Sequence, residues 1–158
     1  MEKSNSGVKE SNIIGGMVAG FVASLVSGLF IILAGAMAIL PNYDYIKIQA
    51  SFFTSLLGLA KDAAIIAWAI YFVFGTFIWG ILYSLMQPKL AGNSQTKRGL
   101  IFGLFTWLIY MLILMPIAGE GLFALKYGIA AAIFTLLLNL IFGATLGATY
   151  NKTSDMGQ

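Results

Sequence analysis

Four long runs without a charged side chain limit what this chain can fold into. The runs cover residues 12–43, 63–88, 99–119 and 127–151. A helix needs about 20 mostly apolar residues to cross the hydrocarbon core of a bilayer, so each run is long enough to span it. Backbone groups in lipid must be hydrogen bonded within their own segment, which favours helices. We therefore expect four transmembrane helices, with spans at about residues 13–40, 63–87, 99–118 and 127–150.

Composition indicates a single domain that has lipid as its solvent. Hydrophobic residues make up 59% of the 158 residues and charged residues only 9%, whereas soluble domains carry about 25% charged residues. The chain contains no Cys and no His, which removes thiolate and imidazole groups as metal ligands, nucleophiles and proton carriers. The net charge of +3 is small and gives no sign of nucleic-acid binding. We therefore expect one all-α membrane domain, residues 1–158, with no cofactor, no metal and no nucleic-acid partner.

A shorter segment between the first two runs has a different pattern. Between residues 47 and 60, apolar side chains recur at Ile48, Phe52, Leu56 and Leu59, which is the spacing of one helix face. The opposite face is polar or small, and the segment is too short to cross a bilayer. The pattern predicts an amphipathic helix that lies in the membrane interface on the outer side. It serves either as a simple connection between two spans or as a lid over a binding site.

Basic residues in the loops favour one orientation in the membrane. On the side that both termini share with the central loop lie Lys3, Lys9, Lys89, Lys97, Arg98 and Lys152. On the other side lie Lys47, Lys61 and Lys126. Because short cytoplasmic loops carry the excess of Lys and Arg, we expect a multi-pass protein of the cell membrane with both termini in the cytoplasm.

The two halves of the chain resemble each other. Residues 28–41 align with residues 103–116 at an offset of 75, with matching Gly, Leu, Phe and Pro residues. Residues 74–83 are echoed by residues 142–150, which repeat the order Phe-Gly, Gly and Tyr. The pattern predicts two copies of a two-helix hairpin, related by an axis along the membrane normal.

Small residues at intervals of four mark one face of several predicted helices. These residues and the polar positions on the same faces are Gly16, Gly20, Ser24, Gly28, Gly99, Gly103, Thr135, Asn139, Gly143 and Gly147. Lipid gives helices no hydrophobic reason to associate, so close backbone approach at small residues supplies much of their packing. We expect these faces to meet another helix, either within this chain or in a partner subunit.

Asn139 is the most polar side chain near the centre of a predicted span. It should hydrogen bond to another helix, and Tyr71, Thr76, Thr106 and Tyr110 are candidate partners. Such a bond either only packs two helices or marks a pore or substrate contact. No Asp, Glu, Lys or Arg lies within the predicted spans, which weighs against a pump or a proton-coupled carrier.

The remaining polar and aromatic residues lie towards the membrane surfaces. Glu120 follows Ala-Gly in a predicted outer loop, where it is either a solvated charge or a ligand contact. Trp79, Tyr83 and Tyr150 lie near the inner ends of the second and fourth spans, a position typical of the interfacial aromatic belt. These residues do not compose an active site, so we expect that the chain is not an enzyme.

Four short motifs resemble those of a known family. They are FGTFIWGILY at residues 74–83, RGLIFG at 98–103, MPIAG at 115–119 and LNLIFGATLG at 138–147. In these motifs the chain is similar to an uncharacterised family of small four-helix prokaryotic membrane proteins. The resemblance implies the same fold and a membrane location. Members of that family often have His where this chain has Tyr71 and Asn139, so an activity that depends on those His residues is not implied here.

Two hypotheses about function remain. The small-residue faces and short loops favour an accessory or scaffold subunit that packs against a larger membrane complex, such as an oxidoreductase or a monooxygenase, or against another copy of this chain. The repeat and the amphipathic segment favour a small transporter or a lipid-handling protein. A dry, filled interior would favour the first hypothesis. A polar cavity at the repeat axis, lined by Asn139 and threonines, would favour the second.

The orientation can be tested with a reporter fused after Gln158. If both termini are cytoplasmic, a reporter that is active only in the cytoplasm should be active and one that matures only outside should not. Activity of the second reporter alone would contradict the Lys and Arg distribution as a guide to topology.

Overall fold

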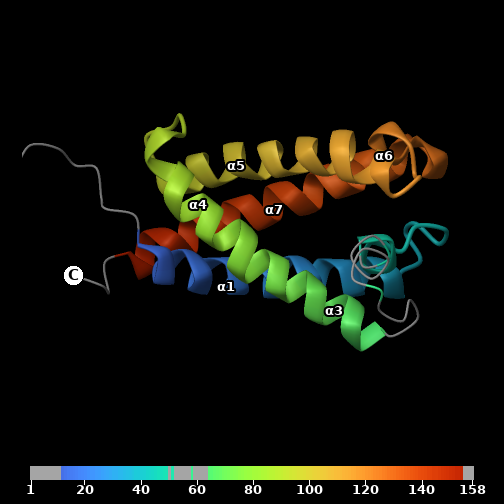
Figure 1. Ribbon diagram of the computed structural model, residues 1–158, viewed down its shortest axis with the longest axis horizontal. Helices are drawn as coiled ribbons and strands as arrows, with labels where there is room; N and C mark the ends of the chain where they lie inside the picture. Colours follow the sequence, from blue (N-terminus) through green and yellow to red (C-terminus); the bar gives the residue numbers. More distant parts are fainter. Residues whose placement is uncertain (1–11, 50, 52–57, 59–63, 155–158) are drawn as a thin grey trace, which may run out of the picture.

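The computed structural model describes residues 12–49, 51, 58 and 64–154, and within them it contains helices and no strand. The helices, shown in Figure 1, are α1 (Ile13–Ala36), α3 (Ala64–Val73), η1 (Phe74–Trp79), α4 (Gly80–Met86), η2 (Gln87–Lys89), α5 (Gln95–Ile109), η3 (Tyr110–Leu114), α6 (Met115–Ile117), η4 (Leu122–Tyr127) and α7 (Ile129–Thr153). Of these, η1 and η3 are π-helices, and η2 and η4 are 3-10 helices.

Four helical stretches are long and apolar enough to cross a membrane. They are Ile13–Ala36, Ala64–Lys89, Gln95–Ile117 and Ile129–Thr153. The second stretch is built from α3, η1, α4 and η2 in series, and the third from α5, η3 and α6. The expectation of an all-α membrane protein with four spans is therefore confirmed.

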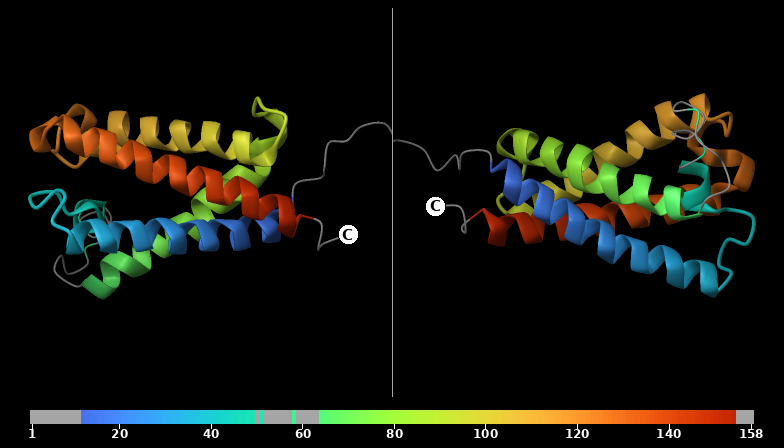
Figure 2. Two further views of the ribbon diagram at one scale, coloured as in Figure 1. Left: turned by 180° about the vertical axis from the view of Figure 1, so that it is seen from behind. Right: turned by 60° about the horizontal axis from the view of Figure 1, so that its bottom comes forward.

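The four spans form two hairpins that meet at one end of the molecule and separate towards the other. The first hairpin contains α1, α3 and α4, and the second contains α5 and α7 (Figure 1). Both views of Figure 2 show α1 and α7 crossing near the two ends of the chain. There Thr153 Oγ1 donates to Gly15 O at 3.1 Å. We call this the terminal end, and the opposite end, which holds residues 37–45 and 118–128, the loop end.

Contact between glycine backbones holds the first hairpin together. A Cβ atom at Gly16 would overlap the carbonyl oxygen of Gly80, and one at Gly20 would overlap that of Gly75. Larger side chains would push α1 away from η1 and α4, so the two helices can pack this closely only because these positions are glycine. The face of α1 that the sequence singled out therefore meets a helix of the same chain.

The second hairpin repeats this arrangement. A Cβ atom at Gly99 would overlap the carbonyl oxygen of Gly143. Gly99 lies 75 residues after Ser24, and Gly143 lies 68 residues after Gly75. Ser24 and Gly75 are also in close contact, because a Cβ atom at Gly75 would overlap Ser24 Oγ. The internal repeat seen in the sequence thus corresponds to equivalent contacts within the two hairpins.

The first span ends at residue 36 and not at residue 40 as the sequence predicted. The chain turns at Ala38, which has a left-handed φ of 49°. Ala38 N donates to Gly35 O at 3.0 Å, and Ile39 N donates to Ala34 O at 3.1 Å. These two bonds form a Schellman motif, which satisfies the last carbonyl groups of the helix and stops it. The sequence prediction placed the end of the span too late because the left-handed residue that stops the helix is alanine, and glycine usually occupies this position.

The third span begins at Gln95 and not at residue 99, so its first turn includes Lys97 and Arg98. The cause is Ser94, whose hydroxyl accepts a hydrogen bond from Lys97 N at 3.2 Å and caps the helix. The first span begins at residue 13 as predicted, and the remaining span ends differ from the predicted ones by one to three residues.

Most of the amphipathic helix predicted for residues 47–60 lies outside the described residues. The described part shows a helix that begins at Tyr45 and covers residues 45–49 and 51. Asp44 Oδ1 accepts a hydrogen bond from Lys47 N at 2.9 Å and caps this helix. Ile46 and Ile48 are buried, so the segment packs against the spans at the loop end.

A second Schellman motif ends the third span, where Gly119 N donates to Pro116 O at 3.0 Å and Glu120 N donates to Met115 O at 2.9 Å. The two motifs predict opposite effects of an exchange between alanine and glycine. Gly119, which ends the third span, has a φ of 79° and open space where a Cβ atom would lie. Replacing Ala38 with glycine should raise the free energy of unfolding by about 1 kcal/mol, and Gly119→Ala should lower it by about the same amount, because the left-handed conformation disfavours a Cβ atom. Denaturation in detergent micelles would measure both, and effects of the same sign would contradict this account of the helix ends.

Candidate functional site

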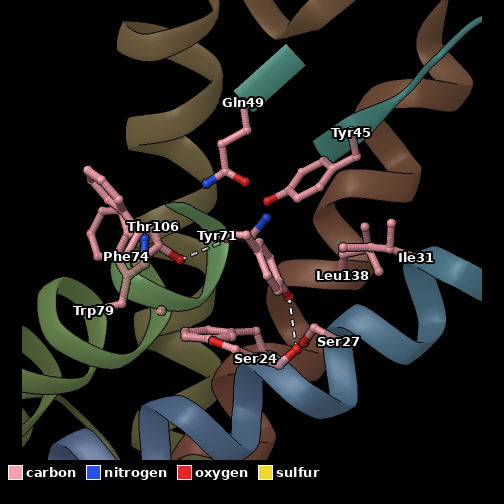
Figure 3. A pocket seen from close by; sticks show the side chains of 13 residues that line it. Ser24, Ser27, Ile31, Tyr45, Gln49, Tyr71, Phe74, Trp79, Thr106 and Leu138 are labelled. Atoms are coloured by element: carbon pink, nitrogen blue, oxygen red, sulfur yellow. Dashed lines mark hydrogen bonds between the residues drawn. The ribbon is translucent and has the colours of Figure 1, made fainter. Parts of the chain in front are cut away.

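A cavity whose wall combines polar and apolar side chains lies between the two hairpins, roughly half-way along the spans. Its volume is about 40 Å³, enough for about three water-sized groups. It is lined by Ser24, Ser27, Ile31, Tyr45, Gln49, Tyr71, Phe74, Gly75, Trp79, Thr106, Leu138, Asn139 and Phe142. Figure 3 shows Tyr45 and Gln49 reaching into the cavity from one side, opposite Ser24 and Ser27 on α1. Every span and the segment at residues 45–49 contribute to its wall.

The first hairpin shapes its side of the cavity through the close contact at Gly75. Ser24 Oγ lies against Gly75 and donates to Gly20 O at 2.9 Å. Tyr71, one turn before Gly75, donates from its hydroxyl to Ser24 O at 3.2 Å. Residues 74–79 then form the π-helical turn η1, a wider turn that often occurs beside functional sites. Phe74 and Trp79 line the cavity from this turn.

The second hairpin contributes a hydrogen-bonded pair of side chains. Thr106 Oγ1 lies 3.1 Å from Asn139 Oδ1 and is also 2.9 Å from Gly103 O. Asn139 Nδ2 donates to Thr135 O at 2.9 Å. Trp107 Nε1 donates to Thr135 Oγ1 at 3.1 Å. Asn139 is thus held across α5 and α7, and Thr106 is one of the four partners that the sequence offered for it.

The segment at residues 45–49 covers the cavity on the side of the loop end. Burial raises the pKa of Tyr45 well above its usual value, and the Asn139 amide that faces the hydroxyl only partly offsets this. Tyr45 is therefore a neutral donor at any physiological pH. Gln49 is only 8% exposed and Ser27 only 3%. Within the described part of the chain, neither Gln49 Oε1 nor Ser27 Oγ has a hydrogen-bond partner.

A larger cavity adjoins this one at the loop end. Its volume is about 380 Å³. It is lined by Ile31, Ala34, Gly35, Ala38, Leu40, Pro41, Tyr43, Asp44, Tyr45 and Phe134. Ile31 and Tyr45 line both spaces, so the two spaces share part of their wall. We call the two spaces the inner cavity and the vestibule.

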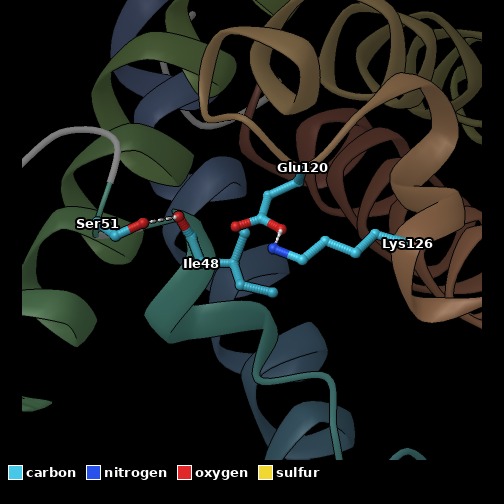
Figure 4. Close-up of polar contacts among 4 residues, drawn as sticks. All are labelled: Ile48, Ser51, Glu120 and Lys126. Atoms are coloured by element: carbon cyan, nitrogen blue, oxygen red, sulfur yellow. Dashed lines mark hydrogen bonds and ion pairs between the residues drawn. The ribbon is translucent and has the colours of Figure 1, made fainter.

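An ion pair orders the second loop at the loop end. Lys126 Nζ lies 2.9 Å from Glu120 Oε2, and Figure 4 shows the two side chains meeting beside Ile48. Burial raises the pKa of the Glu120 carboxyl, but hydrogen bonds from Lys126 and Tyr127 and the charge of Lys126 outweigh it, so the pKa is lowered overall. Glu120 is paired with Lys126, and it does not line either cavity.

The terminal end is closed by a layer of packed side chains from both hairpins. Tyr83, Phe102, Leu146 and Tyr150 are all 0% exposed, and we call them the plug. The rings of Tyr83 and Tyr150 meet edge to face, with centroids 5.4 Å apart. Phe142 and Trp79, which line the inner cavity, pack against this layer. The plug therefore separates the inner cavity from the terminal end.

The assignment of Tyr83 and Tyr150 to an interfacial aromatic belt is wrong. Each hydroxyl instead bonds to the start of another span: Tyr83 donates to Gln95 O at 2.9 Å, and Tyr150 accepts from Asn12 N at 3.1 Å. With these bonds, both tyrosine side chains lie inside the bundle, away from lipid. Trp79 is only partly buried, and it lines the inner cavity.

The residues that the sequence singled out fall into two groups. Ser24 and Asn139 line the inner cavity. The others form helix contacts within the chain: Gly16, Gly20 and Gly28 against α3, η1 and α4, and Gly99, Gly103, Thr135, Gly143 and Gly147 between α5 and α7. Ser27, Tyr45 and Gln49 were not among the site residues predicted from the sequence. Ser27 was visible as a polar residue three positions after Ser24, on a helix face otherwise made of Gly and Ala.

Comparison with known proteins identifies the family. The model of a family of unknown function, DUF6789, matches residues 11–158. The chain belongs to this family, as the resemblance in its four motifs indicated. Searches of the curated proteins and of the solved structures gave no match.

The bond between Thr106 and Asn139 can be measured with a double-mutant cycle. Thr106→Val and Asn139→Leu should show a coupling free energy of about 0.6–1.7 kcal/mol, because either change removes the bond between the two side chains in a poorly hydrated interior. Unfolding in mixed micelles would give the four free energies. A control cycle pairs Thr106→Val with Thr145→Val, which lies six residues further along α7 than Asn139. This cycle should show a coupling free energy near zero. Equal coupling in both cycles would contradict a specific bond.

Proposed function

We propose that this member of the family DUF6789 is a small membrane transporter whose two hairpins rock against each other around the inner cavity. The observation that carries this proposal is a cavity between the hairpins, lined in part by the polar side chains of Asn139 and Thr106, in a protein that is otherwise built from apolar spans. Transporters made of repeats characteristically bind their substrate near the middle of the membrane, between the repeats. This cavity lies at that place.

The arrangement of contacts supports a rocking motion. Within each hairpin, glycine backbones touch directly, so neither hairpin can open without losing its closest packing. Between the hairpins, the plug closes the terminal end, while the vestibule leaves the loop end accessible. Opening the plug and closing the vestibule would expose the cavity to the other side. The excess of Lys and Arg at the terminal end supports an orientation in which the vestibule faces outwards.

The accessory-subunit hypothesis loses its main support. It was based on small-residue faces that could receive a partner helix, but a Cβ atom at Gly16, Gly20, Gly99 or Gly143 would meet a neighbouring helix of the same chain. We also propose that the chain carries out no chemical reaction. In support, the described residues that line the inner cavity include no carboxylate, ammonium or guanidinium group that could act as an acid, a base or a nucleophile.

Labelling of single cysteines tests the rocking motion, because the native chain contains no Cys. Leu146 is 0% exposed and lies in the plug between the hairpins. In proteoliposomes, Leu146→Cys should react with a maleimide about 10 to 1,000 times more slowly than Thr96→Cys, which is exposed at the start of α5. That ratio corresponds to an opened state populated at about 0.1–10%.

Ser84→Cys is the matched control. Ser84 is also 0% exposed, but it lies inside the first hairpin, where its Cβ atom is close to Gly16. It should stay unreactive, because rocking does not separate helices of one hairpin. If Leu146→Cys is as inert as Ser84→Cys, the hairpins do not move apart at the terminal end and the transporter proposal fails.

A further inference from the structure

We infer that the inner cavity is a binding site for a small uncharged solute that both donates and accepts hydrogen bonds, a solute of the size of urea, and that Ser27 and Gln49 are its contacts. The inference rests on the proposed transport function and names the class of substrate. It is carried by polar atoms that are buried, aimed into the cavity and unpaired, together with the volume and the charge of the site.

Ser27 and Gln49 line the inner cavity from opposite sides. Ser27 belongs to α1, and Gln49 belongs to the segment at residues 45–49, which covers the cavity (Figure 3). Both residues are more than nine-tenths buried, and in the described part of the chain Ser27 Oγ and Gln49 Oε1 have no partner. The Tyr71 hydroxyl next to Ser27 donates its proton to Ser24 O, so it can meet Ser27 only as an acceptor. Buried groups of this kind are rarely left unpaired unless water or a ligand meets them.

The unpaired groups are not spread evenly over the molecule. In the described residues, the buried side-chain atoms without a hydrogen-bond partner belong to Ser27, Tyr43, Gln49 and Tyr110. Tyr43 lines the vestibule, and the ring of Tyr110 lies 5.6 Å from that of Tyr45. Ser27, Tyr43 and Gln49 each line one of the two cavities, whereas Tyr110 lines neither. The hydroxyl of Ser27 and the amide of Gln49 are the unpaired groups in the wall of the inner cavity.

Buried polar groups at the terminal end show the opposite behaviour. Gln87 is 2% exposed, yet its Oε1 accepts from Gln95 Nε2 at 2.9 Å and from Arg98 Nη1 at 3.2 Å. The hydroxyls of Tyr83 and Tyr150 are also bonded. These polar groups at the terminal end thus have hydrogen-bond partners within the protein, whereas Ser27 Oγ and Gln49 Oε1 at the inner cavity do not.

The chemistry of the lining selects a neutral solute. A serine hydroxyl donates and accepts, an amide side chain offers two donors and an acceptor, and the neutral Tyr45 phenol donates. None of these groups balances a full charge, and burying an ion without a counter-charge in the middle of a membrane is costly. A neutral molecule with both donors and acceptors can pair with all of them.

The volume sets the size of the solute. A space of about 40 Å³ holds about three water-sized groups, so a molecule of about four non-hydrogen atoms, such as urea, is near the upper limit. The vestibule is much larger, at about 380 Å³, and selects little by size. Selection by size therefore falls to the shared wall of the two spaces, at Ile31 and Tyr45.

Stopped-flow light scattering of proteoliposomes tests the inference with urea as the probe. Wild-type protein should raise the urea permeability above that of protein-free liposomes. Ser27→Ala and Gln49→Met should each lower the protein-dependent part about three- to tenfold, the loss expected for one hydrogen bond to a neutral group. Ser84→Ala should leave it unchanged, because the Ser84 hydroxyl bonds to Ile81 O and lies outside both cavities. Gel filtration of each variant checks that it is folded.

The outcomes separate the substrate class from the transport function. Acceleration of water alone, or equal acceleration of urea and potassium, would overturn the neutral solute site. Urea flux that is insensitive to both Ser27→Ala and Gln49→Met would overturn the assignment of the contacts. If urea is not transported while Leu146→Cys is labelled, the solute class is wrong and the rocking mechanism stands. If neither urea flux nor labelling is seen, both proposals fail.

Discussion

Direct contact between glycine backbones is the interaction on which the rest of this structure depends. Lipid does not press apolar helices together, so only close packing and hydrogen bonds hold the spans in place. The contacts of Gly16 with Gly80 and of Gly99 with Gly143 make each hairpin a tight unit. Between the hairpins, α1 also packs against α7, where Ala19 and Ala23 lie in one buried cluster with Phe142, Leu146 and Tyr150. The inner cavity adjoins this cluster at Phe142.

Contacts between the hairpins close the bundle at one end only. Each tyrosine of the plug lies near the end of an even-numbered span and bonds to the start of an odd-numbered one, Tyr83 to Gln95 and Tyr150 to Asn12. The two tyrosines occupy equivalent places in the internal repeat, and their bonds tie the hairpins together at the terminal end. At the loop end the space is filled instead by residues 45–49, which belong to neither repeat copy's spans. The terminal end is closed by equivalent tyrosines of the two repeat copies, whereas residues 45–49, which cover the loop end, are not part of the repeat.

Much of the fold could be predicted from the sequence, because hydrophobic length and small-residue spacing act locally. The four spans, the faces that pack and the bond between Asn139 and Thr106 follow from these signals. The direction in which Tyr83 and Tyr150 point could not be predicted, because an aromatic residue near a span end suits either lipid headgroups or an inner contact. The site was found only in part for a similar reason. Gln49 lines the cavity because residues 45–49 lie over the bundle. That position depends on tertiary packing, and no periodic pattern in the sequence predicts it.

The π-helical turn η1 has a consequence for how the protein arose. Gly75 and Gly80 are five residues apart, whereas their counterparts Gly143 and Gly147 are four apart. A π turn takes up one residue more than an α turn, so η1 absorbs the difference and keeps Tyr83 opposite Tyr150. A duplicated hairpin whose two copies differ by one residue accounts for this pattern. The extra residue lies in the cavity wall, so the two sides of the inner cavity are unequal while the flanking contacts stay in register.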